Sequence, residues 1–219
     1  FNLLEMGISP ESSHHEEGPG QNEIDFRYST PLNAADNAVT FKSVVQTIAR
    51  RNGLFADFSP KPLMHESGNG LHINVSVKAE SGEDVTESFM AGVLEHTVEM
   101  TAFFNPVAAS YKRLGEKKAP KYVTWSHENR SQLIRIPAVK SESHRRMELR
   151  SPDPAANPYI VYALIIYAGL DGIKRNLKPA APCNCNLFTA DSAVTDSLTN
   201  LPDTIEKARN IAKNSEFIK

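Results

Sequence analysis

The segment RRMELR (145–150) alternates charged and apolar residues, and this period of two fits an extended strand. Arg146, Glu148 and Arg150 then share one face of a sheet, and the methionine and leucine between them share the other. LHINVSV (71–77) shows the same alternation, with a histidine, an asparagine and a serine on its polar face. A chain with two such strands needs a core that covers one face of the sheet and leaves the other face polar.

Apolar residues at helical spacing mark four further segments as helices. The predicted helices span 33–52, 85–103, 157–176 and 201–214. Two more segments, 54–62 and 131–137, are predicted as short strands, the first of them broken by two prolines. Residues 179–200 are loop-like and rich in Pro, Asn, Ser and Thr. This mixture favours an α+β fold in which an antiparallel sheet packs one face against helices.

The length and the charge of the chain narrow the class of protein. A chain of 219 residues, 40% of them hydrophobic, builds one large globular domain or two small ones. The formal net charge of -2 points to no nucleic acid and no anionic membrane as a partner. The longest apolar run, 159–170, is shorter than the ~20 residues that span a bilayer.

Cys183 and Cys185 are the two cysteines of the chain. So few thiols exclude a disulfide scaffold and favour a reducing, cytoplasmic compartment. Because no other cysteine and no nearby histidine completes a ligand set, two ordinary thiols in a loop are favoured over a metal clip.

The segment SSHHEEGPGQNEIDF (12–26) gathers two histidines and three glutamates around a Gly-Pro-Gly turn. The turn lets Glu16 and Glu23 approach one ion from neighbouring strands, although acidic loops of this kind are commonly just solvated. The polar strand face has a second interpretation too, since a row of Arg, Glu and Arg also suits a surface ion-pair ladder. With Arg130 and Arg135 beside it, a polyphosphate held with Mg²⁺ or Mn²⁺ satisfies both the guanidinium groups and the carboxylates.

Five motifs follow one another along the chain. They are ESSHHEEGPGQNEIDFRY (11–28), SPKPLMHESGNGLHINVSV (59–77), SYKRLGEKKAPKYVTW (110–125), ENRSQLIRIP (128–137) and RRMELRSPDPAANPYIVYALIIYAGLDGIK (145–174). Together they resemble the catalytic domain of glutamine synthetase. The resemblance implies an α+β fold with a curved antiparallel sheet and flanking helices, the glutamine synthetase/guanido kinase-like catalytic domain. It also implies a homo-oligomer with sites between subunits.

The chemistry that the resemblance implies is the ATP-dependent ligation of ammonia to the γ-carboxylate of glutamate, which gives glutamine through γ-glutamyl phosphate. The implied cofactors are ATP and two Mg²⁺ or Mn²⁺ ions, which neutralise phosphate charge.

The resemblance also assigns roles to individual residues, motif by motif. The implied metal ligands are Glu16 and Glu23 for one ion, and His72 and Glu148 for the other. The implied glutamate site comprises Arg113, Arg150, Gly68 and Ser67. The implied nucleotide and phosphate contacts are Glu11, Tyr28, Asn74, Ser76, Arg130, Arg135 and Arg146. The implied catalytic residues are Arg113, Arg130 and Glu116. The residues expected to support the turn, without binding metal, are His14, His15 and Glu17.

Three positions depart from the family pattern. Asn74 replaces a second histidine, and Ser67 replaces the asparagine of the glutamate loop. Lys118 holds the place of the flap acid that accepts and deprotonates ammonium, and Glu116, two residues earlier, is the candidate to replace that acid. Two alternatives therefore stay open. One is a γ-glutamyl ligase for another amine, such as a polyamine or ethanolamine, and the other is a non-catalytic glutamine-synthetase-like protein.

The chain starts at Phe1 without a methionine and ends at Lys219 within a charged helical pattern. We therefore expect residues 1–219 to be a partial catalytic domain without the family's N-terminal β-grasp domain, first catalytic-domain strand and C-terminal helices. In the family that strand carries a Glu-x-Glu pattern, which supplies one carboxylate to each metal. We expect the 219 residues by themselves to bind metal weakly and to make no glutamine.

Overall fold

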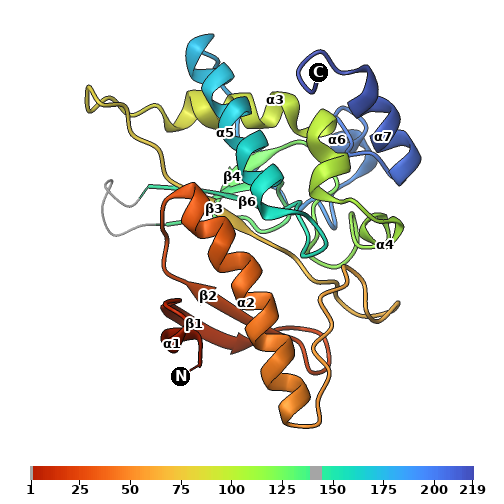
Figure 1. The fold of residues 1–219 in the computed structure, drawn as a ribbon. Helices are drawn as coiled ribbons and strands as arrows, with labels where there is room; N and C mark the ends of the chain where they lie inside the picture. The colour runs from red at the N-terminus through yellow and green to blue at the C-terminus, as the bar shows by residue number, and fades with distance from the viewer. Residues whose placement is uncertain (1, 139–144) are drawn as a thin grey trace.

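A computed structural model describes residues 2–138 and 145–219 (Figure 1). Its helices are α1 (Asn2–Glu5), α2 (Pro31–Arg51), α3 (Thr86–Phe104), α4 (Ala108–Tyr111), α5 (Pro158–Lys174), α6 (Ser192–Thr195) and α7 (Ile205–Asn214). Its strands are β1 (Pro10–His15), β2 (Asn22–Phe26), β3 (Ile73–Val75), β4 (Trp125–His127), β5 (Ile134–Ile136) and β6 (Met147–Leu149). The strands of the described residues form two sheets, a hairpin of β1 and β2 and a four-stranded sheet in the order β3-β6-β5-β4.

The four-stranded sheet keeps its apolar and polar residues in separate rows. β6 pairs antiparallel with β3 and β5, whereas β4 pairs parallel with β5. The register places Leu149 of β6 between Ile73 of β3 and Ile134 of β5, and all three side chains are buried. The polar residues next to them in sequence therefore share the opposite face. The predicted α+β fold with flanking helices is confirmed.

Helices α3 and α5 pack against each other and against the apolar row of the sheet (Figure 1). Helix α5 begins after Asn157, whose side chain accepts a hydrogen bond from the backbone of Tyr159, with Pro158 in the first helical turn. Gly92 of α3 faces Gly172 of α5, and a Cβ on Gly172 would lie only 2.7 Å from the Gly92 nitrogen. The two backbones therefore approach more closely than any larger residue permits.

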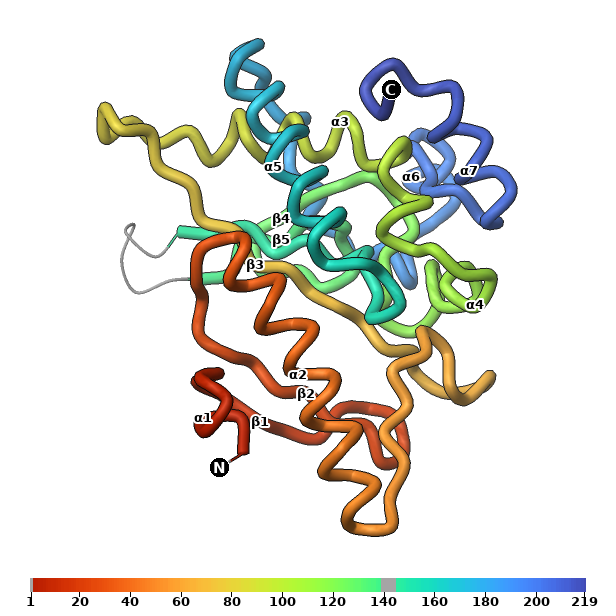
Figure 2. The backbone as a smooth tube through the Cα atoms, in the orientation of Figure 1, coloured from red at the N-terminus to blue at the C-terminus, as the bar shows by residue number. Residues whose placement is uncertain are grey.

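The β1–β2 hairpin lies beside α2 and below the four-stranded sheet in this view (Figure 2). The rings of Phe26 in β2 and Phe41 in α2 pack with their centroids 5.7 Å apart. At the turn of the hairpin, Gln21 Nε2 donates a hydrogen bond to the carbonyl of Gly68 at 3.1 Å. This contact joins the acidic turn to the loop of residues 65–70, although the two segments are far apart in sequence.

Most of the predicted elements are confirmed. The four predicted helices form as α2, α3, α5 and α7, and the predicted strands at 71–77, 131–137 and 145–150 form as the shorter strands β3, β5 and β6. The loop predicted for 179–200 contains one short helix, α6.

The strand predicted for residues 54–62 is wrong, because the structure has no strand over this segment. Pro60 and Pro62 have no backbone N–H to donate to a ladder. The carbonyl of Pro60 instead accepts a hydrogen bond from the backbone of Asn69 at 2.9 Å. The segment thus supports the 65–70 loop rather than a sheet.

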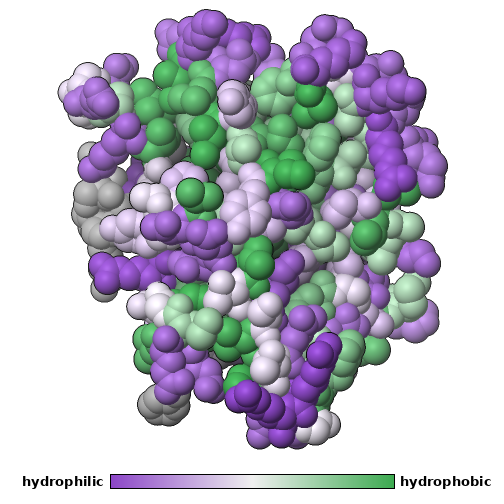
Figure 3. Space-filling model, in the orientation of Figure 1, coloured by the Kyte–Doolittle hydropathy of each residue, from purple (hydrophilic) through white to green (hydrophobic). Residues whose placement is uncertain are grey.

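On the face that Figure 3 shows, apolar side chains gather over α5, whereas the region around α7 is mostly hydrophilic. The exposed apolar residues of α5 include Ile160, Tyr167 and Leu170. Within the described ranges, no helix combines the length and the hydrophobicity needed to cross a membrane.

Candidate active site

Glu148 is a buried carboxylate in the middle of the polar sheet face, with only 5% of its surface exposed. Its Oε2 accepts a hydrogen bond from Arg135 Nε at 2.5 Å, and its Oε1 accepts one from Arg150 Nη1 at 3.2 Å. His72 Nδ1 lies 3.4 Å from the same Oε1. Because Glu148 and Arg150 are both buried, the surface ion-pair ladder does not describe this pair.

Two buried arginines give this face positive charge. Arg113 is 3% exposed and donates to the carbonyls of Ser151 at 2.8 Å and Arg150 at 3.1 Å. Burial lowers the pKa of Arg113 to about 10, so its guanidinium stays charged at neutral pH. Arg150 Nη2 donates to the carbonyl of Lys118 at 3.3 Å, and its Nε is buried without a partner among the described residues. The pair can therefore receive an anion such as a carboxylate.

His72 is held neutral beside Glu148. Burial lowers the pKa of His72 well below its usual range, and the charges of Arg150, Arg113, Arg135 and Arg130 add to this effect. A neutral imidazole is the form that binds a metal ion. The backbone of Gly70 lies close to the ring of His72, because a Cβ at Gly70 would be only 2.8 Å from His72 Nε2.

The hairpin contributes a second cluster. Ligand atoms of His14, Glu16 and Glu23 all lie within 4.8 Å of one another, and His14 Nε2 is 3.2 Å from Glu16 Oε1. Burial raises the pKa of Glu23, and the negative charges of Asp25, Glu16 and Glu148 raise it further. Carboxylates that repel one another in this way fit a divalent cation, which the sequence predicts at Glu16 and Glu23. His14, expected only to support the turn, lies in the same cluster.

Replacing Glu23 with glutamine tests this cluster. The folded state of the metal-free protein favours protonated Glu23, so the contribution of Glu23 to stability is present below the usual carboxyl pKa. It is lost as the pH rises through the raised pKa. We therefore expect Glu23→Gln to leave the metal-free protein at least as stable as the wild type at pH 7. We also expect it to remove most of the stabilisation by Mn²⁺, which is about 2.7 kcal/mol at a hundredfold excess over Kd.

The measurement is thermal unfolding of the natural protein that carries this chain, with and without Mn²⁺. Glu80→Gln, on the exposed loop after β3, is the matched control and should keep the full metal effect. A Glu23→Gln protein that Mn²⁺ stabilises as strongly as the wild type would contradict the cluster as a metal site.

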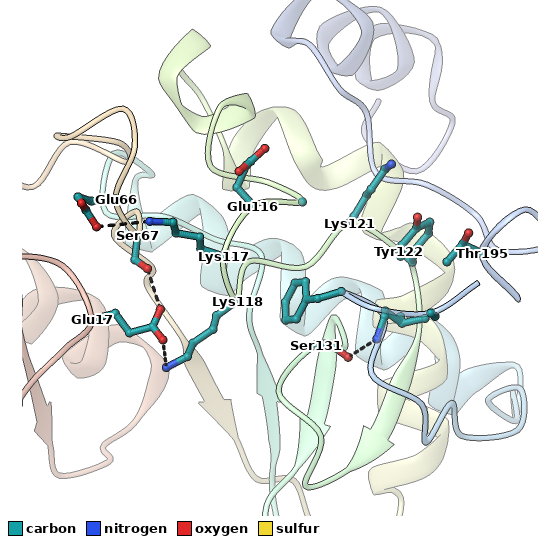
Figure 4. Close-up of a pocket in the computed structure, with 14 residues that line it drawn as sticks. Glu17, Glu66, Ser67, Glu116, Lys117, Lys118, Lys121, Tyr122, Ser131 and Thr195 are labelled. Carbon is teal, nitrogen blue, oxygen red and sulfur yellow. Dashed lines mark hydrogen bonds and ion pairs between the residues drawn. The ribbon is translucent and has the colours of Figure 1, made fainter. Parts of the chain in front are cut away.

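Lys118 connects the flap, residues 115–120 between α4 and β4, to the hairpin. Its Nζ lies 2.9 Å from Glu17 Oε1, and Ser67 Oγ donates to Glu17 Oε2 at 2.8 Å (Figure 4). The hydrogen bond from Lys118 contributes most to lowering the pKa of Glu17, and the hydrogen bond from Ser67 contributes next. Lys117 Nζ, next to it on the flap, donates to the carbonyl of His65. The flap, the hairpin turn and the 65–70 loop thus meet at one place.

These three segments line one side of a cavity of about 920 Å³ (Figure 4). Tyr122 and Ser131 lie on the other side (Figure 4), and Leu187 and Phe188 also belong to the lining. Glu116 belongs to the lining, is exposed, and has no ion-pair partner in the described part of the chain. The cavity has room for a small polar substrate. Arg113 and Arg150 are not among the described residues that line it, and Arg150 reaches its wall through the hydrogen bond to the carbonyl of Lys118.

A known protein family matches the whole of this chain. The model described as "Glutamine synthetase, catalytic domain" matches residues 1–219. The chain belongs to the glutamine synthetase family. A curated glutamine synthetase of Clostridium saccharobutylicum is 44% identical over 232 residues, which cover 99% of this chain and 52% of that protein. A glutamine synthetase of Methanosarcina mazei is 43% identical over 235 residues, covering 100% of this chain and 52% of its own length.

Solved structures agree with the family assignment. A GmaS/ADP complex, in its conformation 1, superposes with a TM-score of 0.88 at 31% identity, over 99% of this chain and 53% of that chain. Apo GmaS without ligand superposes with a TM-score of 0.86 at 32% identity, over 99% and 52%. The chain therefore spans about half the length of the relatives that it matches.

Not every residue that the glutamine synthetase motifs single out lies in the buried cluster. Arg146 Nε donates to Asn74 Oδ1 at 3.1 Å at the edge of the polar face. Arg130 lies exposed in the loop after β4, where its charge still acts on His72. Glu11, Tyr28 and Ser76 also lie exposed, and within the described residues their side chains make no hydrogen bond.

The sequence interpretation missed two parts of this glutamine-synthetase-like site. One is His14, whose proximity to Glu23 follows from the antiparallel register that pairs these two residues across the hairpin. The other is the contact of Lys118 with Glu17. A strand assignment for residues 10–15 and 22–26 would have predicted the pairing of His14 with Glu23. No local sequence pattern predicts the contact of Lys118 with Glu17.

Proposed function

We propose that the natural protein that carries this chain ligates ammonia to the γ-carboxylate of glutamate at the expense of ATP. The observation that carries the proposal is the buried Glu148 between Arg135 and Arg150, with neutral His72 beside it. Such a face combines metal ligands with fixed cations, which is what phosphoryl transfer to a carboxylate needs. The curated relatives named glutamine synthetase support the same reaction.

The nucleotide phosphates are proposed to lie along Arg130, Arg135 and Arg146. Guanidinium groups hold phosphate oxygens through paired hydrogen bonds and stabilise charge that spreads over the transferred phosphoryl group. The solved GmaS/ADP complex supports an adenine nucleotide as the ligand of this fold. The exposed position of Arg130 leaves it free to reach a ligand at the mouth of the site.

Glutamate is proposed to bind at Arg113 and Arg150, next to the loop of Ser67 and Gly68. A Cβ on Gly68 would lie 2.9 Å from Arg113 Cγ, so this loop rests directly on the arginine. With its carboxylate held by fixed donors, glutamate attacks the γ-phosphorus of ATP through its γ-carboxylate and releases ADP. Ammonia then displaces phosphate from γ-glutamyl phosphate.

The divalent ions are proposed at two ligand sets. His14, Glu16 and Glu23 would hold one, and His72 with Glu148 would hold the other. Bound Mg²⁺ or Mn²⁺ would neutralise the phosphate charge. At the second set, Arg135 and Arg150 already occupy lone pairs of Glu148, so a metal has to share this carboxylate with them.

Glu116 is proposed to accept and deprotonate the ammonium ion before ammonia attacks γ-glutamyl phosphate. Lys118 and Lys117 are paired with Glu17 and Glu66, which leaves Glu116 as the acid of this wall without an ion-pair partner in the described ranges. One free carboxylate suits the single charge of ammonium. The lysines around it disfavour a polyamine, which carries several positive charges. Among organic amines, ethanolamine is therefore the second candidate.

The assay is ADP release by the natural protein with ATP, glutamate, Mg²⁺ and one amine at a time. We expect kcat/KM for ammonia to exceed those for ethanolamine and a polyamine by about a hundredfold or more. Release of ADP that requires an organic amine would favour the γ-glutamyl ligase for that amine. Nucleotide binding without γ-glutamyl phosphate would favour the non-catalytic protein.

The family assignment also supports a homo-oligomer that works in the cytoplasm, with residues 1–219 as part of the catalytic domain. Sedimentation of the natural protein tests the oligomer directly.

A further inference from the structure

Cys183 and Cys185 place their sulfur atoms 3.3 Å apart, and both thiols are free and partly exposed. A disulfide bond needs the two atoms to approach to about 2.05 Å. Closure therefore brings the two sulfur atoms about 1.2 Å closer, and the strain of the small ring falls on the backbone of Cys183 and Cys185.

The backbone of the same two residues holds the loop that carries Arg130. The carbonyl of Cys185 accepts hydrogen bonds from Asn129 Nδ2 at 2.9 Å and from Gln132 Nε2 at 3.0 Å. The backbone N–H of Cys183 donates to the carbonyl of Trp125, the first residue of β4, at 2.8 Å. The two cysteines therefore lie at the point where the 183–187 segment joins β4 and the loop that follows it.

A second contact continues this junction into the cavity. Ser131 Oγ accepts a hydrogen bond from the backbone N–H of Leu187 at 3.0 Å, and both residues line the cavity (Figure 4). Any change in the backbone of Cys183 and Cys185 thus reaches both the Arg130 loop and the cavity wall.

We propose that Cys183 and Cys185 form a reversible dithiol–disulfide switch that controls the position of the Arg130 loop. The oxidant is an organic disulfide such as oxidised glutathione. One thiolate attacks it and releases one thiol, and the second thiolate then closes the S–S bond and releases the other. The pair loses two electrons and two protons, and the organic disulfide becomes two thiols. The effect on catalysis rests on the proposed function, in which Arg130 faces the phosphates.

The small ring favours a switch over a structural bond. One residue separates the two cysteines, so the disulfide closes a strained ring, and strained disulfides are the ones that reducing agents open readily. A reducing compartment keeps such a pair open until an oxidant accumulates. The hydrogen bond from Cys183 raises the pKa of the Cys185 thiol, and we therefore expect closure to speed up towards alkaline pH.

The first experiment asks whether the pair closes. The natural protein is incubated with oxidised glutathione at pH 8, and its intact mass is measured before and after dithiothreitol. We expect a product lighter by two hydrogens that dithiothreitol reverses. Cys185→Ser should instead carry one glutathione on Cys183. A wild-type protein that keeps both thiols, or that carries glutathione without closing the ring, would overturn the proposal.

The second experiment asks what closure does. The KM for ATP is measured for the reduced and the oxidised protein, with the Cys183→Ser/Cys185→Ser double variant as the matched control. We expect oxidation to raise this KM about tenfold, the effect of disturbing one buried hydrogen bond, and to leave the double variant unchanged. A closed pair with unchanged KM would refute the control of the Arg130 loop while leaving the proposed function intact. If the reduced protein forms no γ-glutamyl phosphate, the proposed function fails, and ADP affinity of the two forms then decides the switch in the same way.

Discussion

Replacing Glu148 with glutamine is expected to lower the free energy of unfolding by about 3 kcal/mol and the turnover by about 10³-fold. Glutamine keeps the shape of the side chain but removes its charge. Arg150, which is 4% exposed, and Arg135 would then remain as buried or half-buried cations without the carboxylate that both now contact. In the proposed function the same change also removes a metal ligand.

Urea unfolding of the natural protein at pH 7 measures the stability change as a lower urea midpoint. Glu80→Gln is the matched control, because it makes the same chemical change on an exposed loop, and it should shift stability by less than about 0.5 kcal/mol. An unchanged urea midpoint for Glu148→Gln would mean that the two arginines do not depend on this carboxylate.

Replacing Gly172 with alanine is expected to destabilise the protein by about 3 kcal/mol, although alanine favours an isolated helix over glycine by about 1 kcal/mol. The added Cβ would overlap the carbonyl oxygen of Ser88 and would lie 2.7 Å from the nitrogen of Gly92. Both atoms belong to the backbone of α3, so no side chain can rotate away. Helices α3 and α5 would have to move apart and open the core.

Lys174→Ala is the control on the same helix, at an exposed position near its C-terminal end. It should change the free energy of unfolding by less than about 0.5 kcal/mol, measured by the same urea titration. A Gly172→Ala protein as stable as the wild type would contradict this prediction. The close approach of Gly92 and Gly172 would then not be needed for the packing of α3 against α5.

Local patterns were sufficient for much of the fold. The alternation in residues 145–150 and 71–77 fixes which side chains share a face, because the period of a strand does not depend on its neighbours. The apolar periodicity of α2, α3 and α5 is equally local. The prediction for residues 54–62 failed because the residue types of a segment do not determine the hydrogen-bond partners of its backbone. The carbonyl of Pro60 accepts a hydrogen bond from Asn69 in the 65–70 loop instead of joining a sheet.

The candidate site divides in the same way. The sequence alone determined the residue types, the shared face of Arg146, Glu148 and Arg150, and the family resemblance, which the family model bears out. The tertiary structure alone decided that Glu148 is buried between two arginines, that Lys118 contacts Glu17, and that the two thiols lie 3.3 Å apart where Cys185 is hydrogen-bonded to the Arg130 loop. These contacts join segments or side chains whose distance depends on packing, and the order of residues along a chain does not encode packing distance directly.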